Sequence, residues 1–233
     1  MRKAKMKRLS IALILSGLCV VNTAAFAGSY SDTTPNTNNV MLQSEPQSPW
    51  MLRVRAIDVV PDEDSSTITV IGGKVTDISN AVVPELDINY FFTPHISTEL
   101  ILATSKHDVK ATNTSLGTVD LGSVYLLPPT LTAVYHFLPN KQIDPYVGAG
   151  VNYTHFYNVD SGPTATSVKY DDTWGPALQA GVDVQVSQHV YLNADIKKVW
   201  IEPDVTVKAL GSTMKTDVNI NPWIFGIGVG YRF

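Results

Sequence analysis

Nine charged residues in this sequence lie at alternate positions within short apolar segments, a spacing that puts side chains on one face of a β-strand. Four are basic and five are acidic, so they can nearly neutralise one another. Because a buried charge is costly unless it is paired, the spacing predicts an ion-pair network wherever these faces meet. The nine residues are Arg53, Arg55, Glu85, Asp87, Glu99, Asp183, Asp195, Lys197 and Arg232.

Catalytic chemistry finds little support in the sequence. A hydrolase needs a nucleophile, a general base and an acid within hydrogen-bond reach of one another, but the five histidines are scattered along the chain. His107 beside Asp108 is the best available pair, and neighbours on a strand point to opposite faces. No metal-ligand spacing, phosphate loop or cofactor motif occurs. We therefore expect no enzyme, no metal site and no cofactor.

The first 27 residues have the three parts of a secretory signal peptide. A basic start precedes the apolar run LSIALILSGLCVV and the small-residue motif Ala25-Phe26-Ala27. The apolar run is shorter than the roughly 20 residues of a membrane-spanning helix, so we expect cleavage after Ala27. Cys19 follows Leu18, where a lipoprotein requires a small residue, and we expect no lipidation.

Removal of this leader leaves 12 basic and 21 acidic residues, a formal net charge of −9. That charge argues against nucleic acid as a partner. The remaining chain has no cysteine, which excludes disulfides and cysteine metal sites. Residues 28–48 are polar and are expected to form a flexible periplasmic segment. Residues 49–233 are then long enough for one all-β domain.

From Trp50 onward, apolar residues recur at every second position, which is the strand signal. The links between these segments alternate in length: they are short at 93–95, 138–144 and 187–189, and long at 61–81, 107–126, 158–173 and 202–218. An even number of strands with tight turns at one end is typical of an outer-membrane β-barrel. The eight predicted strands are 50–60, 82–92, 96–106, 127–137, 145–157, 174–186, 190–201 and 221–233.

A soluble β-sandwich or lipocalin-like barrel is the competing architecture. It would turn the apolar faces inward and the charged faces to water. The apolar faces here also carry aromatic residues near the strand ends, which favours lipid outside and charges in a narrow lumen. Lys198 departs from the pattern and is interpreted as a register shift or a snorkelling side chain. The aromatic residues are Trp50, Tyr90, Phe92, Tyr135, Phe137, Tyr157, Trp174, Trp223 and Tyr231.

Four blocks of sequence together resemble the OmpW family of Gram-negative outer-membrane proteins. They are LPPTLTAVYHF (127–137), PYVGAGVNYT (145–154), WGPALQAGVDV (174–184) and NPWIFGIGVGYRF (221–233). The resemblance is close over the last five predicted strands and is one of layout in the first three. It implies an eight-stranded barrel in the outer membrane whose narrow, largely hydrophobic channel passes small hydrophobic compounds. The implied partners are outer-membrane lipid and a small hydrophobic ligand or detergent.

Pro128 and Pro129 bear on a sideways exit through the barrel wall, which the resemblance also implies. They remove two backbone donors at the outer end of the fourth strand, where proline is tolerated at strand starts, edges and bulges. Either the strand starts there or the wall has an opening; the sequence leaves both interpretations open. The apolar loop stretches 66–73 and 115–127 fit either a funnel above the lumen or strands that extend beyond the membrane.

The last predicted strand has one aromatic, apolar face and one nearly bare face. Gly226 and Gly228 are expected to leave lumen volume, and Arg232 to meet Glu85 or Glu99. Tyr231 and Phe233 resemble the signal read by the barrel-assembly machinery. Both chain ends are expected to lie in the periplasm. The alternative to a channel is a structural or surface-receptor barrel, and a lipid-modifying enzyme is the least favoured possibility.

Overall fold

The computed structural model describes residues 47–233 except 63, 66–73, 115–116, 163–166 and 210–211. The expected signal peptide, its cleavage at Ala27 and the segment 28–46 lie outside the described residues, as does the apolar stretch 66–73. Within the described ranges there is no helix long and apolar enough to cross a membrane.

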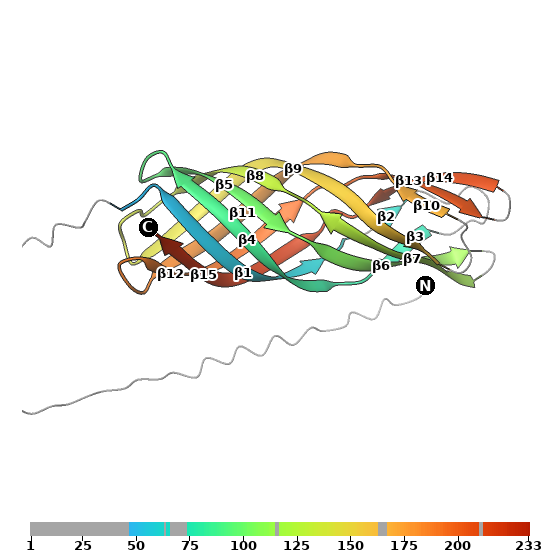
Figure 1. Ribbon diagram of the computed structural model, residues 1–233, viewed down its shortest axis with the longest axis horizontal. Helices are drawn as coiled ribbons and strands as arrows, with labels where there is room; N and C mark the ends of the chain where they lie inside the picture. Colours follow the sequence, from blue (N-terminus) through green and yellow to red (C-terminus); the bar gives the residue numbers. More distant parts are fainter. Residues whose placement is uncertain (1–46, 63, 66–73, 115–116, 163–166, 210–211) are drawn as a thin grey trace, which may run out of the picture. The chain divides into compact units, whose positions relative to one another are not determined.

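Eight antiparallel strands form a closed barrel, in the order β1-β4-β5-β8-β9-β11-β12-β15 (Figure 1). The barrel closes where β15 pairs with β1, from Met51 opposite Arg232 to Val60 opposite Trp223. The predicted all-β, eight-stranded antiparallel fold is therefore confirmed. The strands are β1 (Trp50–Val60), β4 (Ala81–Phe91), β5 (Ile96–Ala103), β8 (Thr130–His136), β9 (Ile143–Ser161), β11 (Thr173–Gln185), β12 (Val190–Val199) and β15 (Trp223–Arg232).

Side chains alternate between the two faces of the barrel wall, as the period of two requires. In β1, Leu52 and Val54 are exposed outward while Arg53 and Arg55 are buried inside. The apolar face also points outward in β15, where Phe225 and Ile227 are exposed. An outward face of this composition suits lipid rather than water.

Where the structure describes them, the long links continue as strands beyond the barrel. One sheet joins β3 (Lys74–Ile78), β6 (Ser105–Thr114) and β7 (Gly117–Leu127) to the outer half of β9. A second sheet has the order β10-β13-β14-β2, with β10 (Ser167–Tyr170), β13 (Asp204–Ala209), β14 (Ser212–Asn219) and β2 (Asp64–Ser65). We call these two sheets together the extension. It lies at the end of the barrel opposite the tight turns (Figure 1).

Apolar residues at alternate positions explain why the extension is ordered. Its strands turn residues such as Val109, Leu121, Val124, Val205 and Val218 toward one buried hydrophobic cluster. Burial of apolar area at about 25 cal/mol per Å² stabilises such a cluster. The described part of the stretch 115–127 thus belongs to a strand that extends the barrel, one of the two readings left open by the sequence.

The glycine-rich face of β15 does not leave free lumen volume, which corrects the interpretation of Gly226 and Gly228. A Cβ on Gly228 would lie 2.2 Å from the Val54 carbonyl oxygen and 2.6 Å from Cγ of Arg55. A Cβ on Gly226 would lie 2.3 Å from Oδ1 of Asp195. The glycines therefore provide the space that the buried arginine and aspartate already fill.

We predict that Gly228→Ala destabilises the barrel by about 1–3 kcal/mol, because the added methyl group overpacks against backbone and a buried arginine. Urea unfolding of the reconstituted protein measures this loss. Ile227→Val is the matched control, since Ile227 is the next residue and is 68% exposed on the outward face. Equal losses in the two variants would contradict the assignment of the glycine face.

Candidate functional site: a charged plug below two apolar cavities

Eight of the nine charged residues meet inside the barrel in one network, which we call the charged plug. Its members come from five strands, and none is more than 8% exposed. Three positive and five negative side chains give it a formal charge of −2. The plug consists of Arg53, Arg55, Glu85, Asp87, Glu99, Asp183, Asp195 and Lys197.

Arg55 is the centre of the plug. Its guanidinium lies 2.9 Å from Glu85, 2.6 Å from Asp87, 2.7 Å from Glu99 and 2.8 Å from Asp195. Four carboxylates from three other strands thus converge on one side chain of β1. The planar, multiply donating guanidinium suits such a role better than an ammonium group does.

Arg53 and Lys197 extend the plug along and across the lumen. Arg53 contacts Glu99 at 3.0 Å and Asp183 at 2.5 Å. Lys197 contacts Glu85 at 2.7 Å and Asp195 at 2.9 Å. These shared carboxylates connect all three cations into one continuous network across the barrel.

Neutral polar groups add hydrogen bonds around the plug. Gln179 donates to Glu99 at 2.7 Å, and Asn193 donates to Asp183 at 2.8 Å and to the Tyr146 hydroxyl at 3.0 Å. Sequence reasoning missed these residues, although Gln179 and Asn193 alternate with apolar neighbours just as the charged residues do. These contacts connect the plug to the neutral side chains of β11 and β12.

Arg232 lies outside the plug, which corrects its expected pairing with Glu85 or Glu99. Its Nε donates to the carbonyl oxygen of Ser48 at 3.1 Å. Its guanidinium lies 4.0 Å from the centroid of the Phe91 ring. The pairing was wrong because both glutamates point toward Arg55 and Arg53, deeper in the lumen. Arg232 instead ties the last strand to the segment before β1.

A Ser-His-Asp chain lies near the tight-turn end and was not predicted from the sequence. His136 lies 3.0 Å from the Ser97 hydroxyl through Nε2 and 2.8 Å from Asp144 through Nδ1. The order matches that of a hydrolytic triad. Ser97 and His136 are each only 1% exposed, and the His136 ring packs against Phe91 and Tyr146. The three side chains therefore satisfy one another's buried hydrogen-bonding groups, and the serine and histidine are not accessible to a substrate.

An apolar cavity of about 40 Å³, the inner cavity, lies directly above the plug. Glu85 and Lys197 form its floor, and its walls are mainly apolar. The volume is sufficient for a few water molecules. The wall residues include Ile57, Val59, Ile101, Leu126, Val199 and Ile220.

The barrel wall beside the inner cavity is interrupted at Pro128 and Pro129. Strands β5 and β8 pair up to Ile101 opposite Thr130, and β6 and β7 pair again from Ser105 opposite Leu126. Residues 102–104 and 127–129 show no strand pairing with each other, although 102–103 still pair with β4 and Leu127 with β9; we call the interruption between these two stretches the wall gap. Ala103 and Pro128 line the inner cavity, so the cavity reaches the gap.

Among the described residues, the carbonyl oxygens of Pro128 and Pro129 accept hydrogen bonds from the adjacent Thr130 and from β9. Asn152 donates to the Pro128 carbonyl oxygen at 3.1 Å, and the Tyr153 amide donates to that of Pro129 at 3.0 Å. Both donors belong to β9. Toward β5 the two prolines have no N–H to offer, because proline lacks the amide hydrogen.

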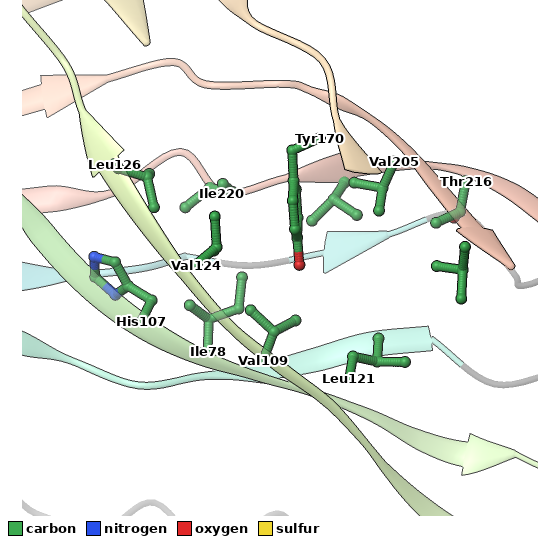
Figure 2. A pocket seen from close by; sticks show the side chains of 12 residues that line it. Ile78, His107, Val109, Leu121, Val124, Leu126, Tyr170, Val205, Thr216 and Ile220 are labelled. Atoms are coloured by element: carbon green, nitrogen blue, oxygen red, sulfur yellow. The ribbon is translucent and has the colours of Figure 1, made fainter. Parts of the chain in front are cut away.

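A second apolar cavity, of about 20 Å³, lies inside the extension and is here called the outer cavity (Figure 2). His107 borders both cavities, as do Leu126 and Ile220. Its Nδ1 lies 2.7 Å from the Ser79 carbonyl oxygen, and its Nε2 lies 2.9 Å from the Ser105 hydroxyl. A carbonyl can only accept, so Nδ1 carries the hydrogen and Nε2 accepts from Ser105.

Lys198 keeps the register of β12, which decides between its two interpretations. It is paired with Trp223 of β15. Its ammonium group bends to the Asn221 carbonyl oxygen at 2.6 Å and to Asp62 at 3.2 Å, and lies over the Trp223 ring.

At the opposite end of β15, Tyr231 and Phe233 are exposed on the outward face.

We predict that the two signs of charge in the plug respond differently to neutralisation. Arg55→Gln leaves four carboxylates without their shared cation and should cost about 3–5 kcal/mol in unfolding free energy. Asp87→Asn lowers the excess negative charge and should change stability by less than about 1 kcal/mol. Urea titration of both variants compares them. Similar losses would show that the excess of carboxylates carries no cost.

A second prediction concerns His107, which lies in β6, where the outward Lys106 and Lys110 are exposed to solvent. Burial lowers the pKa of His107 below its ordinary value of 6.5. The opened extension therefore takes up the proton first, and its stability falls as the pH falls below about 6.5. The protection factors of the β6 and β7 amides, which relate each exchange rate to the intrinsic rate at that pH, should be lower at pH 5.5 than at 7.5, and His107→Gln should remove this dependence.

Comparison with known proteins agrees with this architecture. The sequence pattern of the OmpW family matches residues 48–233. The uncharacterized outer-membrane protein y4mB of Sinorhizobium fredii is 41% identical over 188 residues, 80% of each chain. The dibenzothiophene metabolism operon protein PahQ of Pseudomonas aeruginosa is 25% identical over 191 residues, 80% of this chain and 90% of that one.

The fold also matches a solved structure. The crystal structure of the outer membrane protein OprG from Pseudomonas aeruginosa aligns with a TM-score of 0.75 at 28% identity, over 82% of this chain and 98% of that one. The family pattern spans the whole barrel and its extension. The resemblance inferred from the four sequence blocks is thereby confirmed, and the chain belongs to the OmpW family of outer-membrane barrels.

Proposed function

We propose that this barrel conducts small hydrophobic molecules from the outside into the outer membrane through its wall rather than through its lumen. The observation that carries the proposal is the position of the inner cavity. It is apolar, it ends below on the charged plug, and it reaches the wall gap at Ala103 and Pro128. An apolar molecule in this cavity has one exit of low polarity, which leads through the wall gap into the membrane.

The plug makes passage along the barrel axis unfavourable. An apolar molecule would have to separate Arg55 from its carboxylates, which are buried and within 2.9 Å. Leaving such charges unpaired costs several kcal/mol. The wall gap lacks this barrier, because no strand pairing among the described residues has to be broken there.

The two cavities are too small for a hydrocarbon chain as they stand, so passage requires movement. Volumes of about 20 and 40 Å³ accommodate water molecules only. The extension can supply the movement, since its two sheets share no ladder between β9 and β10 among the described pairings. Separation of the sheets would widen both cavities together.

The orientation that goes with this route places the extension outside and the tight turns, with both chain ends, in the periplasm. The barrel-assembly machinery would then read the exposed Tyr231 and Phe233 at the end of the last strand. The relative PahQ supports an apolar substrate, because it is named for an operon of dibenzothiophene metabolism. Dibenzothiophene itself is an apolar aromatic compound.

A structural or surface-receptor barrel is the second candidate. The ordered extension favours it, because strands with exposed charges such as Lys106, Asp108 and Lys110 offer a surface to partners. Uptake of a hydrophobic compound by cells that contain the barrel separates the two functions. A receptor leaves the uptake rate unchanged, whereas a channel raises it.

We predict that closing the wall gap abolishes this uptake. Leu102→Cys and Leu127→Cys place thiols on the two sides of the gap, and a short reducible cross-linker can join them. The cross-linked barrel should take up octane at the rate of cells without the barrel, and reduction should restore transport. The chain has no other cysteine beyond Cys19 in the expected leader.

The matched control joins a complete part of the wall. Ala180 and Ile196 are paired neighbours on β11 and β12, across a continuous ladder. Cross-linking cysteines at these positions should leave uptake unchanged. Lateral exit is wrong if both cross-links, or neither, block uptake.

A further inference from the structure

The outer cavity has an almost entirely apolar lining with three polar residues among the twelve that border it (Figure 2). These are His107, Tyr170 and Thr216. Both ring nitrogens of His107 are occupied, by Ser79 and Ser105. Thr216 also has partners. The polar group that remains is the hydroxyl of Tyr170.

The Tyr170 hydroxyl points between the two sheets of the extension, into the cavity (Figure 2). Its ring stacks on Phe156 at a centroid distance of 5.3 Å, which fixes the direction of the hydroxyl. It makes no hydrogen bond to any residue that the structure describes. Burial raises its pKa, so the group is a neutral donor at every physiological pH. A half-buried hydroxyl that faces an apolar cavity without a described partner favours a ligand that can accept from it.

We propose that the outer cavity selects neutral apolar molecules that carry one hydrogen-bond-accepting oxygen, such as ketones, and holds that oxygen at the Tyr170 hydroxyl. This inference rests on the proposed function and names its substrate class. Plain hydrocarbons fit the apolar lining but leave the donor unpaired. The oxygenated molecule satisfies both parts of the cavity.

Carboxylates are excluded by the charge of the lining. No Lys or Arg is among the described residues that border the outer cavity. An ionised carboxylate would lose its hydration and gain one neutral hydrogen bond, which does not compensate. Lys197, the cation that borders the inner cavity, is already paired with Glu85 and Asp195.

Tyr170 is also placed where the cavity can widen. It lies on β10, at the boundary with β9 that has no described ladder pairing. The Asp172 carboxylate closes this boundary by accepting from the Tyr153 hydroxyl at 2.7 Å and from the Phe156 amide at 3.2 Å. A molecule that enters between the sheets therefore meets Tyr170 at the edge of the second sheet, before it reaches His107.

The test compares octane, 2-octanone and octanoate in cells that contain the full-length wild type or Tyr170→Phe. Wild type should take up 2-octanone faster than octane and should not raise octanoate uptake. Loss of one neutral hydrogen bond should slow 2-octanone uptake about five- to tenfold at limiting concentration. Octane uptake should stay unchanged. Tyr125→Phe is the matched control, because Tyr125 is a half-buried tyrosine on the outward side of β7.

A second measurement uses 2-octanone labelled with carbon-13 at its carbonyl and the purified barrel in lipid nanodiscs. A hydrogen bond from Tyr170 moves the carbonyl resonance downfield in wild type and in Tyr125→Phe, and the shift should be absent in Tyr170→Phe. Heat-dependent gel mobility checks that each variant is folded.

The possible outcomes separate this proposal from the proposed function. If octane uptake is raised but Tyr170→Phe changes neither the ketone-to-octane ratio nor the carbonyl resonance, the selection by Tyr170 is wrong and the channel stands. If wild type raises no uptake, the channel is wrong, and the carbonyl resonance still decides whether Tyr170 binds the ketone. A preference for octanoate, or a cavity that binds water only, overturns the inference.

Discussion

The contact between Arg55 and four carboxylates is the interaction on which the rest of the barrel depends. Each partner lies within 2.9 Å, and all are withdrawn from water. Such a cluster is stable only if every strand that contributes to it stays in register, because removal of one partner leaves a buried charge. The plug thereby ties β1 to β4, β5 and β12 across the lumen, independently of the backbone ladder.

The plug also explains the glycines of the closing strand. Arg55 needs space beside β15, and the positions opposite it in register are Gly228 and, next to it, Gly226. The bare face of the strand looks like a channel lining in the sequence, but it is the counterpart of large side chains from β1. A glycine stripe in a barrel strand therefore indicates either open lumen or a bulky neighbour, and only the register distinguishes them.

The fold could be predicted from the sequence because the period of two is a local property. In residues 52–56, for example, apolar and charged residues alternate, and the predicted strand 50–60 forms β1 with those bounds. The ion-pair partners within the site could not be predicted from the sequence. Arg232 and Arg55 both alternate with apolar residues, yet of the two only Arg55 reaches Glu85. Depth in the lumen follows from strand tilt and register. The Ser97-His136-Asp144 chain was missed for the same reason, because its members lie on three different strands.

The charged plug disfavours an apolar molecule, whereas the apolar cavities above it favour one. The wall gap offers such a molecule an exit that avoids the plug. A barrel that only needed rigidity would gain from continuous pairing between β5 and β8. Here Pro128 and Pro129 end that pairing at the level where the lumen changes from charged to apolar. Backbone donors are missing at the wall gap, where an apolar molecule would leave. Paired charges lie in the lumen below it, where an apolar molecule would not pass. That coincidence of two independent features favours a sideways path over a purely structural role.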